Sequence, residues 1–293
     1  MTNQAALLSV APQPEPDESL LGYVLRLTQL NGLPKSSWLF RTAGLPLSDH
    51  SLLATYPWDL TMLAACCGVE SGRLERMAYW PTKAAGELNF LGHGIREDLV
   101  TVRHRRVCGR CLLDRPYHQA IWDLSVMTVC PRHGCYLDFA CRFCGRQLNW
   151  RAEALTRCSC GRDYSGAPTR AAPIDVVETV KMVSRTLSPD SPAAKGDWIW
   201  LAYQLGWLAT GGNGLGRPIG FLEIEGDTSG ILAAGMAGAV GNFTEFLDRM
   251  MAFGPAGETH WRLARTFRLV SELVSTPQKA AKLSETRARM LRG

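Results

Sequence analysis

The stretch Cys108–Gly134 reads CGRCLLDRPYHQAIWDLSVMTVCPRHG, with a Cys-x-x-Cys pair at one end and Cys-Pro-Arg-His at the other. Zinc takes four thiolate or imidazole ligands in a tetrahedron, and a Cys-x-x-Cys on a tight turn supplies two of them. The 18 residues between Cys111 and Cys130 can form an excursion that returns to the same ion. The stretch therefore predicts a zinc site made of three cysteines and one histidine.

A second arrangement of the same kind follows, with Cys-x-x-Cys and, 13 residues later, Cys-x-Cys. The two sets predict two zinc ions held by Cys108, Cys111, Cys130 and His133 and by Cys141, Cys144, Cys158 and Cys160. A cross-braced pairing, in which the first pair shares its ion with the third, stays open, and Cys135 could compete with His133. Four protein ligands leave no open coordination position, so we expect both ions to be structural.

Composition and cysteine usage fit an intracellular globular protein. The 293 residues are 46% hydrophobic and 20% charged, as in ordinary globular domains. Eight of the ten cysteines lie between Cys108 and Cys160, which favours metal binding over a disulfide framework. The first residues lack the basic region of a secretory signal, and the longest apolar runs are too short to span a bilayer. We expect a cytoplasmic protein with no membrane partner.

The net charge of +5 is unevenly distributed. Residues 99–170 hold 12 arginines, no lysine and 5 acidic residues, a net of +7, whereas residues 1–98 carry −3 and residues 171–293 carry +1. The planar fork of arginine suits phosphate, so this segment suggests a nucleic acid or an acidic protein surface as partner, or else a solvated basic face. Candidate nucleic-acid contacts are Arg103, Arg105, Arg106, Arg110 and Arg115, with Arg73 and Arg76 from a preceding helical hairpin.

That hairpin is predicted within Asp59–Pro81, DLTMLAACCGVESGRLERMAYWP. Its apolar positions and its turn glycine have the spacing of a helix-turn-helix: Leu63, Cys67, Gly68, Val69, Leu74 and Met77. Asp59 can cap the first helix, and Ser71 lies where the second can start. Because Glu70 and Glu75 offset the two arginines, a structural hairpin is favoured over direct reading of bases.

The rest of the chain predicts a mainly α fold. We expect an extended or disordered lead-in over residues 1–16, a helical domain over 17–98, a tandem zinc module with short strands over 99–165, and a helical domain over 174–293. A helix is expected to begin at Leu20 and to end at Asn31-Gly32. Ser165–Pro173 is predicted to be a linker. The C-terminal helices are expected at Ile174–Leu187, Trp198–Leu208, Phe243–Phe253 and His260–Val274, with a Gly-rich connection between the second and the third.

Aromatic residues and histidines alternate with the cysteines. The aromatics Tyr117, Trp122, Tyr136, Phe143, Trp150 and Tyr164 could stack on bases, but packing against the zinc knuckles as a small core is favoured. His104 and His118 are expected at the surface or on phosphate groups and not on a metal. No P-loop, His-Glu-x-x-His or Gly-x-Ser-x-Gly motif is present, so we expect no enzyme; a metal-dependent nuclease is the least favoured hypothesis.

Taken together, the motifs resemble the TniQ family over residues 12–165. The N-terminal resemblance consists of Pro14, Pro16, Glu18-Ser19-Leu20, Gly22-Tyr23, Arg26-Leu27 and Asn31-Gly32. The second part consists of Cys108–Leu112, Arg115-Pro116-Tyr117-His118, Trp122, Cys130–Gly134 and Cys141–Gly145.

The resemblance implies a non-enzymatic adaptor in target selection for DNA transposition. Members of this family link a target recogniser to an AAA+ ATPase that recruits the transposase. The recogniser is either the protein's own DNA-binding surface or a CRISPR effector complex with its guide RNA, and family members often work as homodimers. The alternative drawn from the residues alone is a stand-alone zinc-containing helix-turn-helix regulator, which reads DNA directly.

Overall fold

The computed structural model describes residues 8–45, 50–152, 154–192, 199–200, 202–203, 206 and 228–240, and the structural statements that follow concern these residues. The helices are α1 Leu20–Leu30, α2 Ser37–Thr42, α3 Ser51–Thr55, α4 Thr61–Cys67, α5 Ser71–Arg76, α6 Gly109–Asp114, α7 Ile174–Thr186 and α9 Thr228–Val240, with 3-10 turns η1 Glu97–Leu99 and η2 Ala120–Asp123. The strands are β1 Glu87–Phe90 and β2 His93–Arg96. This part of the chain is therefore helix-rich, with one small sheet.

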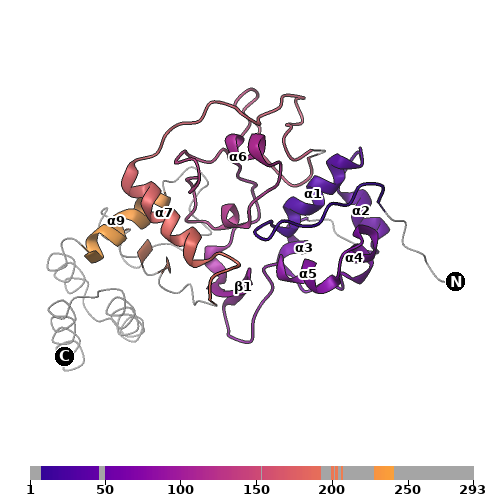
Figure 1. Cartoon of the computed structure of the whole chain (residues 1–293), viewed down its shortest axis with the longest axis horizontal. Coiled ribbons are helices and arrows are strands. Elements are labelled where there is room, and N and C mark those ends of the chain that lie inside the picture. Colours follow the sequence, from indigo (N-terminus) through magenta and orange to yellow (C-terminus); the bar gives the residue numbers. More distant parts are fainter. Residues whose placement is uncertain are drawn as a thin grey trace.

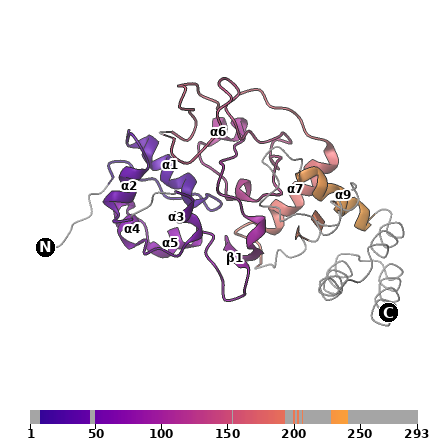
Figure 2. The same cartoon turned by 180° about the vertical axis from the view of Figure 1, so that it is seen from behind.

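The described elements follow the chain from one side of the molecule to the other. Helices α1 to α5 gather at one side, α7 and α9 lie at the other, and the cysteine-rich segment lies between them (Figures 1 and 2). One cluster of buried apolar side chains extends from Leu20 in α1 to Ala233 in α9. The cysteine-rich segment is therefore packed between two helical groups and does not stand apart from them.

Helix α1 begins and ends where the sequence predicts. The Ser19 hydroxyl accepts a hydrogen bond from the Gly22 amide at 3.1 Å and so caps the first turn. After the last turn, Gly32 takes a left-handed conformation with φ +60°. The Asn31 side chain bonds both the amide and the carbonyl of Val10, at 2.9 and 2.7 Å. The described part of the lead-in is thus extended and bound to α1.

Helices α4 and α5 form the predicted hairpin. Gly68 turns the chain with φ +65°, a left-handed conformation that favours glycine. Leu63, Cys67 and Leu74 are buried between the two helices and the core. Asp59 accepts a hydrogen bond from the Thr61 amide at 2.9 Å, and α5 starts at Ser71. Two short helices joined at Gly68 therefore lie where the sequence predicts a helical hairpin.

The strands lie elsewhere than expected. The antiparallel pair β1–β2 precedes the cysteine-rich segment, with Glu87 opposite Arg96. Within the described residues 99–165 the extended chain makes only isolated bridges, such as Val107 with Asp138 and Ala140 with Gln147. The prediction of short strands inside the zinc module is therefore wrong in its placement. Closely spaced metal ligands turn the chain too often for a ladder to develop.

The segment Ser165–Pro173 is not a free linker. The Tyr136 amide donates to the Arg170 carbonyl at 2.9 Å, and the Ala172 amide donates to the Gly134 carbonyl at 2.9 Å. The Arg170 guanidinium stacks over the Tyr136 ring at 4.0 Å. These contacts pair the segment with the Cys130–Cys135 turn, so its polar, Pro-containing sequence belongs to the packed structure.

Helix α7 confirms the first C-terminal prediction, and α9 corrects another. The sequence predicts a Gly-rich connection between the second and third helices, but this region contains helix α9. The apolar residues of α9 lie on all sides of the helix, so its sequence has no amphipathic periodicity. Where α9 crosses the segment that contains Ala202 and Gly206, a Cβ added at Gly235 would lie 1.8 Å from the Ala202 carbonyl oxygen. Glycine permits this close approach. The helices predicted at Phe243–Phe253 and His260–Val274 lie outside the described residues.

Candidate metal centres

The first cysteine cluster brings together the four residues that the sequence selected. Their ligand atoms lie within 4.8 Å of one another. The Cys111 and Cys130 sulfurs are 3.6 Å apart, and His133 Nδ1 lies 3.4, 3.2 and 3.8 Å from the sulfurs of Cys108, Cys111 and Cys130. With Zn–S bonds of about 2.3 Å and Zn–N bonds of about 2.0 Å, a tetrahedral ion separates its sulfurs by about 3.8 Å and sulfur from nitrogen by about 3.5 Å. The cluster fits such an ion.

Local turns set this geometry. The Gly134 amide donates to the Cys130 carbonyl at 2.9 Å, and Gly134 takes φ +59°, which directs His133 back toward the sulfurs. The His133 amide also donates to the Cys130 sulfur at 3.4 Å. On its outer side, His133 Nε2 lies 3.3 Å from the Asp114 carboxylate, which also pairs with Arg132 at 3.1 Å. Asp114 thus orients the imidazole in the manner of the carboxylates that support metal-bound histidines.

The second cluster is equally compact but more exposed. The Cys141 and Cys160 sulfurs are 3.8 Å apart, and those of Cys144 and Cys158 are 3.6 Å apart. Cys144 and Cys160 are exposed, whereas three of the four ligands of the first cluster are buried. The turn that carries Cys158 and Cys160 is closed by the Gly161 amide, which donates to the Cys158 carbonyl at 2.8 Å. Both clusters pair sequential cysteines, and the cross-braced grouping is not formed.

The remaining cysteines, Cys66, Cys67 and Cys135, do not belong to the four-ligand groups. The Cys135 sulfur is 3.7 Å from that of Cys108, behind the first cluster, where it is buried. Cys66 and Cys67 belong to α4, and burial raises the pKa of Cys67 to about 12. A thiol with so high a pKa stays protonated, which makes it inert toward metal and oxidant. The prediction that these two cysteines are core residues is confirmed.

Two of the predicted nucleic-acid contacts are buried instead. Arg105 is 1% exposed, donates to the Leu155 carbonyl at 3.0 Å and bonds the Tyr164 hydroxyl. Tyr164 in turn donates to the same carbonyl at 2.5 Å. Arg105 therefore ties the segment before Cys108 to the loop that carries the second cluster. It cannot reach a phosphate from this position.

Arg106 is likewise buried, on the opposite side of the backbone. It is 6% exposed and donates to the carbonyls of Leu124, Ser125 and Met127 at 2.9, 3.4 and 3.2 Å. These bonds hold the extended segment that leads into Cys130. The expectation that Arg105 and Arg106 meet nucleic acid is wrong. The two side chains bond different segments of the chain, and packing against these segments buries both of them. Of the other candidates, Arg76, Arg103, Arg110 and Arg115 are exposed.

His118 is also an interior residue, contrary to the surface position expected for it. Its Nε2 lies 2.9 Å from the Arg106 carbonyl, which can only accept, so Nε2 carries the proton. Its Nδ1 then accepts from the Ser19 hydroxyl at 2.9 Å. Burial lowers the pKa of His118 well below its usual value, and the charges of Arg105 and Arg106 act in the same direction. The neutral imidazole joins the start of α1 to the cysteine-rich segment.

Gly22 explains how closely the two parts approach. A Cβ built at this position would lie 2.4 Å from the His118 Cβ and 2.8 Å from the Ser19 hydroxyl. The glycine is therefore needed for close contact and not for backbone freedom. Spacing along the sequence does not indicate this contact, because Ser19 and His118 are 99 residues apart.

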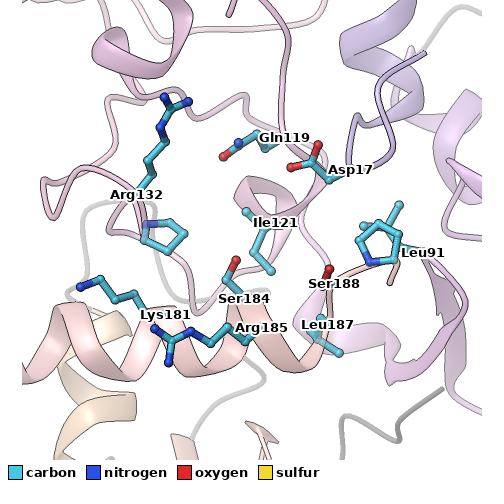
Figure 3. Close-up of a pocket in the computed structure, with 12 residues that line it drawn as sticks. Asp17, Leu91, Gln119, Ile121, Arg132, Lys181, Ser184, Arg185, Leu187 and Ser188 are labelled. Carbon is cyan, nitrogen blue, oxygen red and sulfur yellow. The ribbon is translucent and has the colours of Figure 1, made fainter. Parts of the chain in front are cut away.

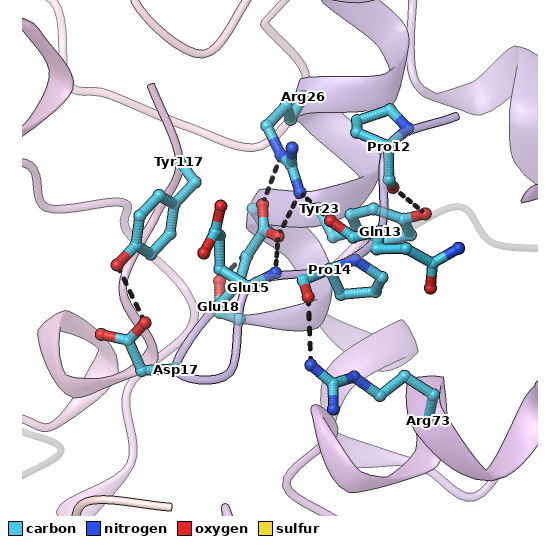
Figure 4. A network of polar contacts seen from close by, with 12 residues as sticks. Pro12, Gln13, Pro14, Glu15, Asp17, Glu18, Tyr23, Arg26, Arg73 and Tyr117 are labelled. Carbon is cyan, nitrogen blue, oxygen red and sulfur yellow. Dashed lines mark hydrogen bonds and ion pairs between the residues drawn. The ribbon is translucent and has the colours of Figure 1, made fainter. Parts of the chain in front are cut away.

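A second group of polar contacts holds the lead-in against α1 (Figure 4). Buried Glu18 forms two bonds with Arg26, at 2.8 and 2.6 Å. Beside it, the Tyr117 hydroxyl donates to Asp17 at 2.9 Å. Arg73 of α5 donates to the Pro14 carbonyl at 3.0 Å. This arginine, a candidate nucleic-acid contact, is engaged within the chain.

Asp123 is a buried carboxylate beside His118, whose Nε2 lies 3.9 Å from the Asp123 Oδ1. It is fully buried, its Oδ2 accepts from the Tyr79 hydroxyl at 2.7 Å, and its Oδ1 accepts no hydrogen bond from the described part of the chain. Burial raises the pKa of Asp123 to about 7, although the Tyr79 hydrogen bond and the Arg106 charge oppose the shift. The folded state consequently binds this proton more tightly than the unfolded state does.

We therefore expect Asp123→Asn to change the pH dependence of stability. The protonated Asp123 contributes to the free energy of unfolding of the wild type. This contribution is fully present below the pKa of the unfolded state, near 4, and is lost as the pH rises through the folded-state pKa of about 7, a change on the order of 4 kcal/mol. The asparagine side chain does not titrate, so the stability of the variant relative to the wild type should increase as the pH rises across that range. Urea unfolding from pH 4.5 to 8 at one saturating zinc concentration measures the difference.

The matched control is Asp59→Asn. Asp59 is exposed, and hydrogen bonds from Thr61 lower its pKa, so its replacement should give a small change of the opposite sign. Parallel stability curves for wild type and Asp123→Asn would contradict the assignment of a raised pKa to Asp123.

A pocket of about 430 Å³ opens between α7 and the first cluster (Figure 3). Arg132, Lys181 and Arg185 contribute cationic groups to its lining, and Asp17 contributes a carboxylate. Arg132 pairs with Asp114 at 3.1 Å and Lys181 with Glu178 at 2.8 Å. The pocket is therefore largely charge-balanced by carboxylates of the same chain.

The comparisons with known proteins concern the first half of the chain. No curated protein matches the sequence significantly. In the described residues no helix is both long enough and apolar enough to cross a membrane. Residues 9–137 match the family model TniQ, a range that begins in the lead-in, includes α1 to α6 and the whole first cluster, and stops before Cys141. This match supports assignment of residues 9–137 to the TniQ family, which suggests an adaptor role associated with transposition.

Proposed function

We propose that the chain is a non-enzymatic adaptor in DNA transposition that links recognition of a target site to an AAA+ transposition ATPase. The family match carries this proposal. The geometry supports it, because each cluster offers four protein ligands to one ion and leaves no open position for water or substrate. Such sites hold a surface in shape and perform no chemistry.

The metal in both clusters is proposed to be zinc. Sulfur separations of 3.6 to 3.8 Å match a tetrahedral ion with Zn–S bonds of about 2.3 Å. Thiolate and imidazole ligands favour zinc over magnesium or calcium, which prefer oxygen. We propose two structural ions, one in each cluster, in a central module of residues 99–165 between helical domains of residues 17–98 and 174–293.

The partner surface for nucleic acid is proposed to include the exposed arginines Arg76, Arg103, Arg110 and Arg115. The side chains of these four candidates are exposed to solvent. The recogniser is either DNA itself or a guide-RNA effector complex, and the chain is proposed to act in the cytoplasm, as a homodimer if it follows other family members.

A stand-alone helix-turn-helix regulator is the second candidate, favoured by the α4–α5 hairpin. The candidate recognition helix α5 is only six residues long. One of its two arginines, Arg73, already bonds the Pro14 carbonyl. A recognition helix reads base edges with several side chains near its start, and α5 offers Arg76 alone. The adaptor is therefore the better-supported function.

Retention of an AAA+ transposition ATPase tests the adaptor. We expect the immobilised full-length chain to retain that ATPase at about 50 mM salt in the presence of ATP and duplex DNA, and to hydrolyse neither ATP nor DNA by itself. Replacing Arg76, Arg103, Arg110 and Arg115 together by Gln should weaken DNA binding and lower its salt slope by about 0.9 for each phosphate that is no longer neutralised. The same variant should still retain the ATPase in the absence of DNA.

The second candidate predicts a different result. If no ATPase is retained, and the chain gives a discrete footprint on duplex DNA that Arg76→Gln abolishes, the protein is a regulator that reads bases directly.

A further inference from the structure

One aromatic side chain of the cysteine-rich segment is exposed. Tyr117, Trp122, Trp150 and Tyr164 are buried, as expected for residues that pack against metal knuckles. Phe143, at the tip of the second cluster, is 60% exposed. A phenylalanine this exposed gains little of the stabilisation that burial would provide, and its ring is accessible to a partner outside the chain.

The chain fixes the backbone turn that carries this ring. Phe143 lies between the ligands Cys141 and Cys144. The Gly145 amide donates to the Cys141 carbonyl at 2.8 Å, and the Cys141 amide donates to the Arg146 carbonyl at 2.8 Å. The turn is closed by these bonds and by the cluster itself. A backbone turn closed in this way loses little conformational entropy on binding.

Four exposed arginines belong to the same part of the cysteine-rich segment as the ring, and we call this group with Phe143 the Phe143 surface: Arg142, Arg146, Arg157, Arg162 and Phe143. The Arg162 guanidinium lies 5.5 Å from the centroid of the ring. Arg142 pairs with Asp138 at 2.7 Å, while Arg146 donates to the Ser159 hydroxyl at 3.2 Å. Because Asp138 balances Arg142, the arginines of this surface without an ion pair to a described carboxylate are Arg146, Arg157 and Arg162.

We propose that the Phe143 surface binds an unpaired segment of DNA, with one base stacked on Phe143 and the adjoining phosphates on the arginines. This inference rests on the proposed function in transposition and names a surface outside the family match, which ends at residue 137. An aromatic ring among arginines is how sequence-tolerant single-strand sites are built, because every base has a π face and every linkage has a phosphate.

An unpaired strand fits this surface better than a duplex does. The described residues between 138 and 164 form turns and isolated bridges, with no helix to enter a major groove. The faces of bases in a duplex are covered by their neighbours, and only an unstacked base can lie on Phe143. An acidic peptide would satisfy the arginines but would leave the ring without a stacking partner.

Fluorescence anisotropy with a labelled 12-nucleotide thymidine strand tests the proposal. Phe143→Ala should weaken binding by roughly 5- to 100-fold, the range for removal of one stacked base, and Phe143→Trp should restore it. The matched control is Leu113→Ala, another exposed apolar residue (66%) on α6 next to the first cluster, which should leave affinity within about twofold. Each variant should retain two zinc ions per chain, which shows that the knuckle is intact.

The arginines give an independent readout. Replacing Arg157 and Arg162 together by Gln should reduce the slope of log affinity against log salt by about 1.4, since each phosphate contact on a single strand contributes about 0.7. A 12-base-pair duplex should show no dependence on Phe143.

Several results would overturn the inference. Phe143→Ala that binds the strand as the wild type does, or a wild type that does not bind it at 50 mM salt, removes the stacking site. A 12-residue polyglutamate bound with the same dependence on Phe143 makes the surface a protein-binding one. Tighter Phe143-dependent binding of uridine RNA than of DNA assigns it to RNA. In each case the adaptor function is tested separately, by whether the immobilised chain retains the ATPase.

Discussion

Cys108→Ser is expected to abolish the cooperative unfolding transition of the described core and to leave at most one zinc ion per chain. Structural zinc contributes an apparent free energy of about 10–16 kcal/mol in zinc-finger peptides, which equals or exceeds the total stability of about 5–15 kcal/mol for an ordinary domain. Cys108 is fully buried and joins α6 to the turn at Cys130. Calorimetry with parallel metal analysis measures both effects.

Two further substitutions show whether burial of the cluster decides the size of this effect. Cys135→Ser makes the same chemical change at a buried sulfur 3.7 Å away, outside the four-ligand group, and should retain two zinc ions. Cys144→Ser, at the exposed second cluster, should lose one ion but keep the main transition, because less of the core rests on it. Cys108→Ser with two zinc ions and a wild-type melting temperature would rule out a metal-dependent first cluster.

Gly22→Ala is the second change with a large expected effect. The new methyl group would lie 2.4 Å from the His118 Cβ, a separation that neither backbone can accept without moving. Overpacking of this kind costs about 3 kcal/mol, which lowers the melting temperature of a region of this size by roughly 6–12 °C. Thermal unfolding of the zinc-loaded protein, followed by near-UV circular dichroism, measures the shift.

The control for this variant is Gly72→Ala in α5. There the added methyl group would meet only the Arg76 guanidinium, at 3.7 Å, and the backbone is helical. Because alanine favours a helix over glycine by up to about 1 kcal/mol, this variant should be slightly more stable than the wild type. Equal stability of Gly22→Ala and the wild type would mean that α1 does not dock on His118.

Local patterns predicted the parts of the fold that depend on neighbours in the sequence. Cap and apolar spacing located α1, and the turn glycine with its flanking apolar positions located the α4–α5 hairpin. Cysteine spacing predicted both ligand groups, because each knuckle is a local turn whose own cysteines are the metal ligands. Helix α9 was missed because its apolar residues surround the helix and leave no period.

The sequence by itself determined which residues can hold metal and that the chain resembles a known family. Only the tertiary structure decided that Arg105 and Arg106 serve the interior, that His118 meets Ser19, and that the Phe143 ring is exposed while Trp122 and Trp150 are buried. The physical reason is that charge and aromaticity are properties of a residue, whereas burial depends on which distant segment packs against it. A guanidinium bonded to carbonyls and one that faces solvent have the same letter in the sequence.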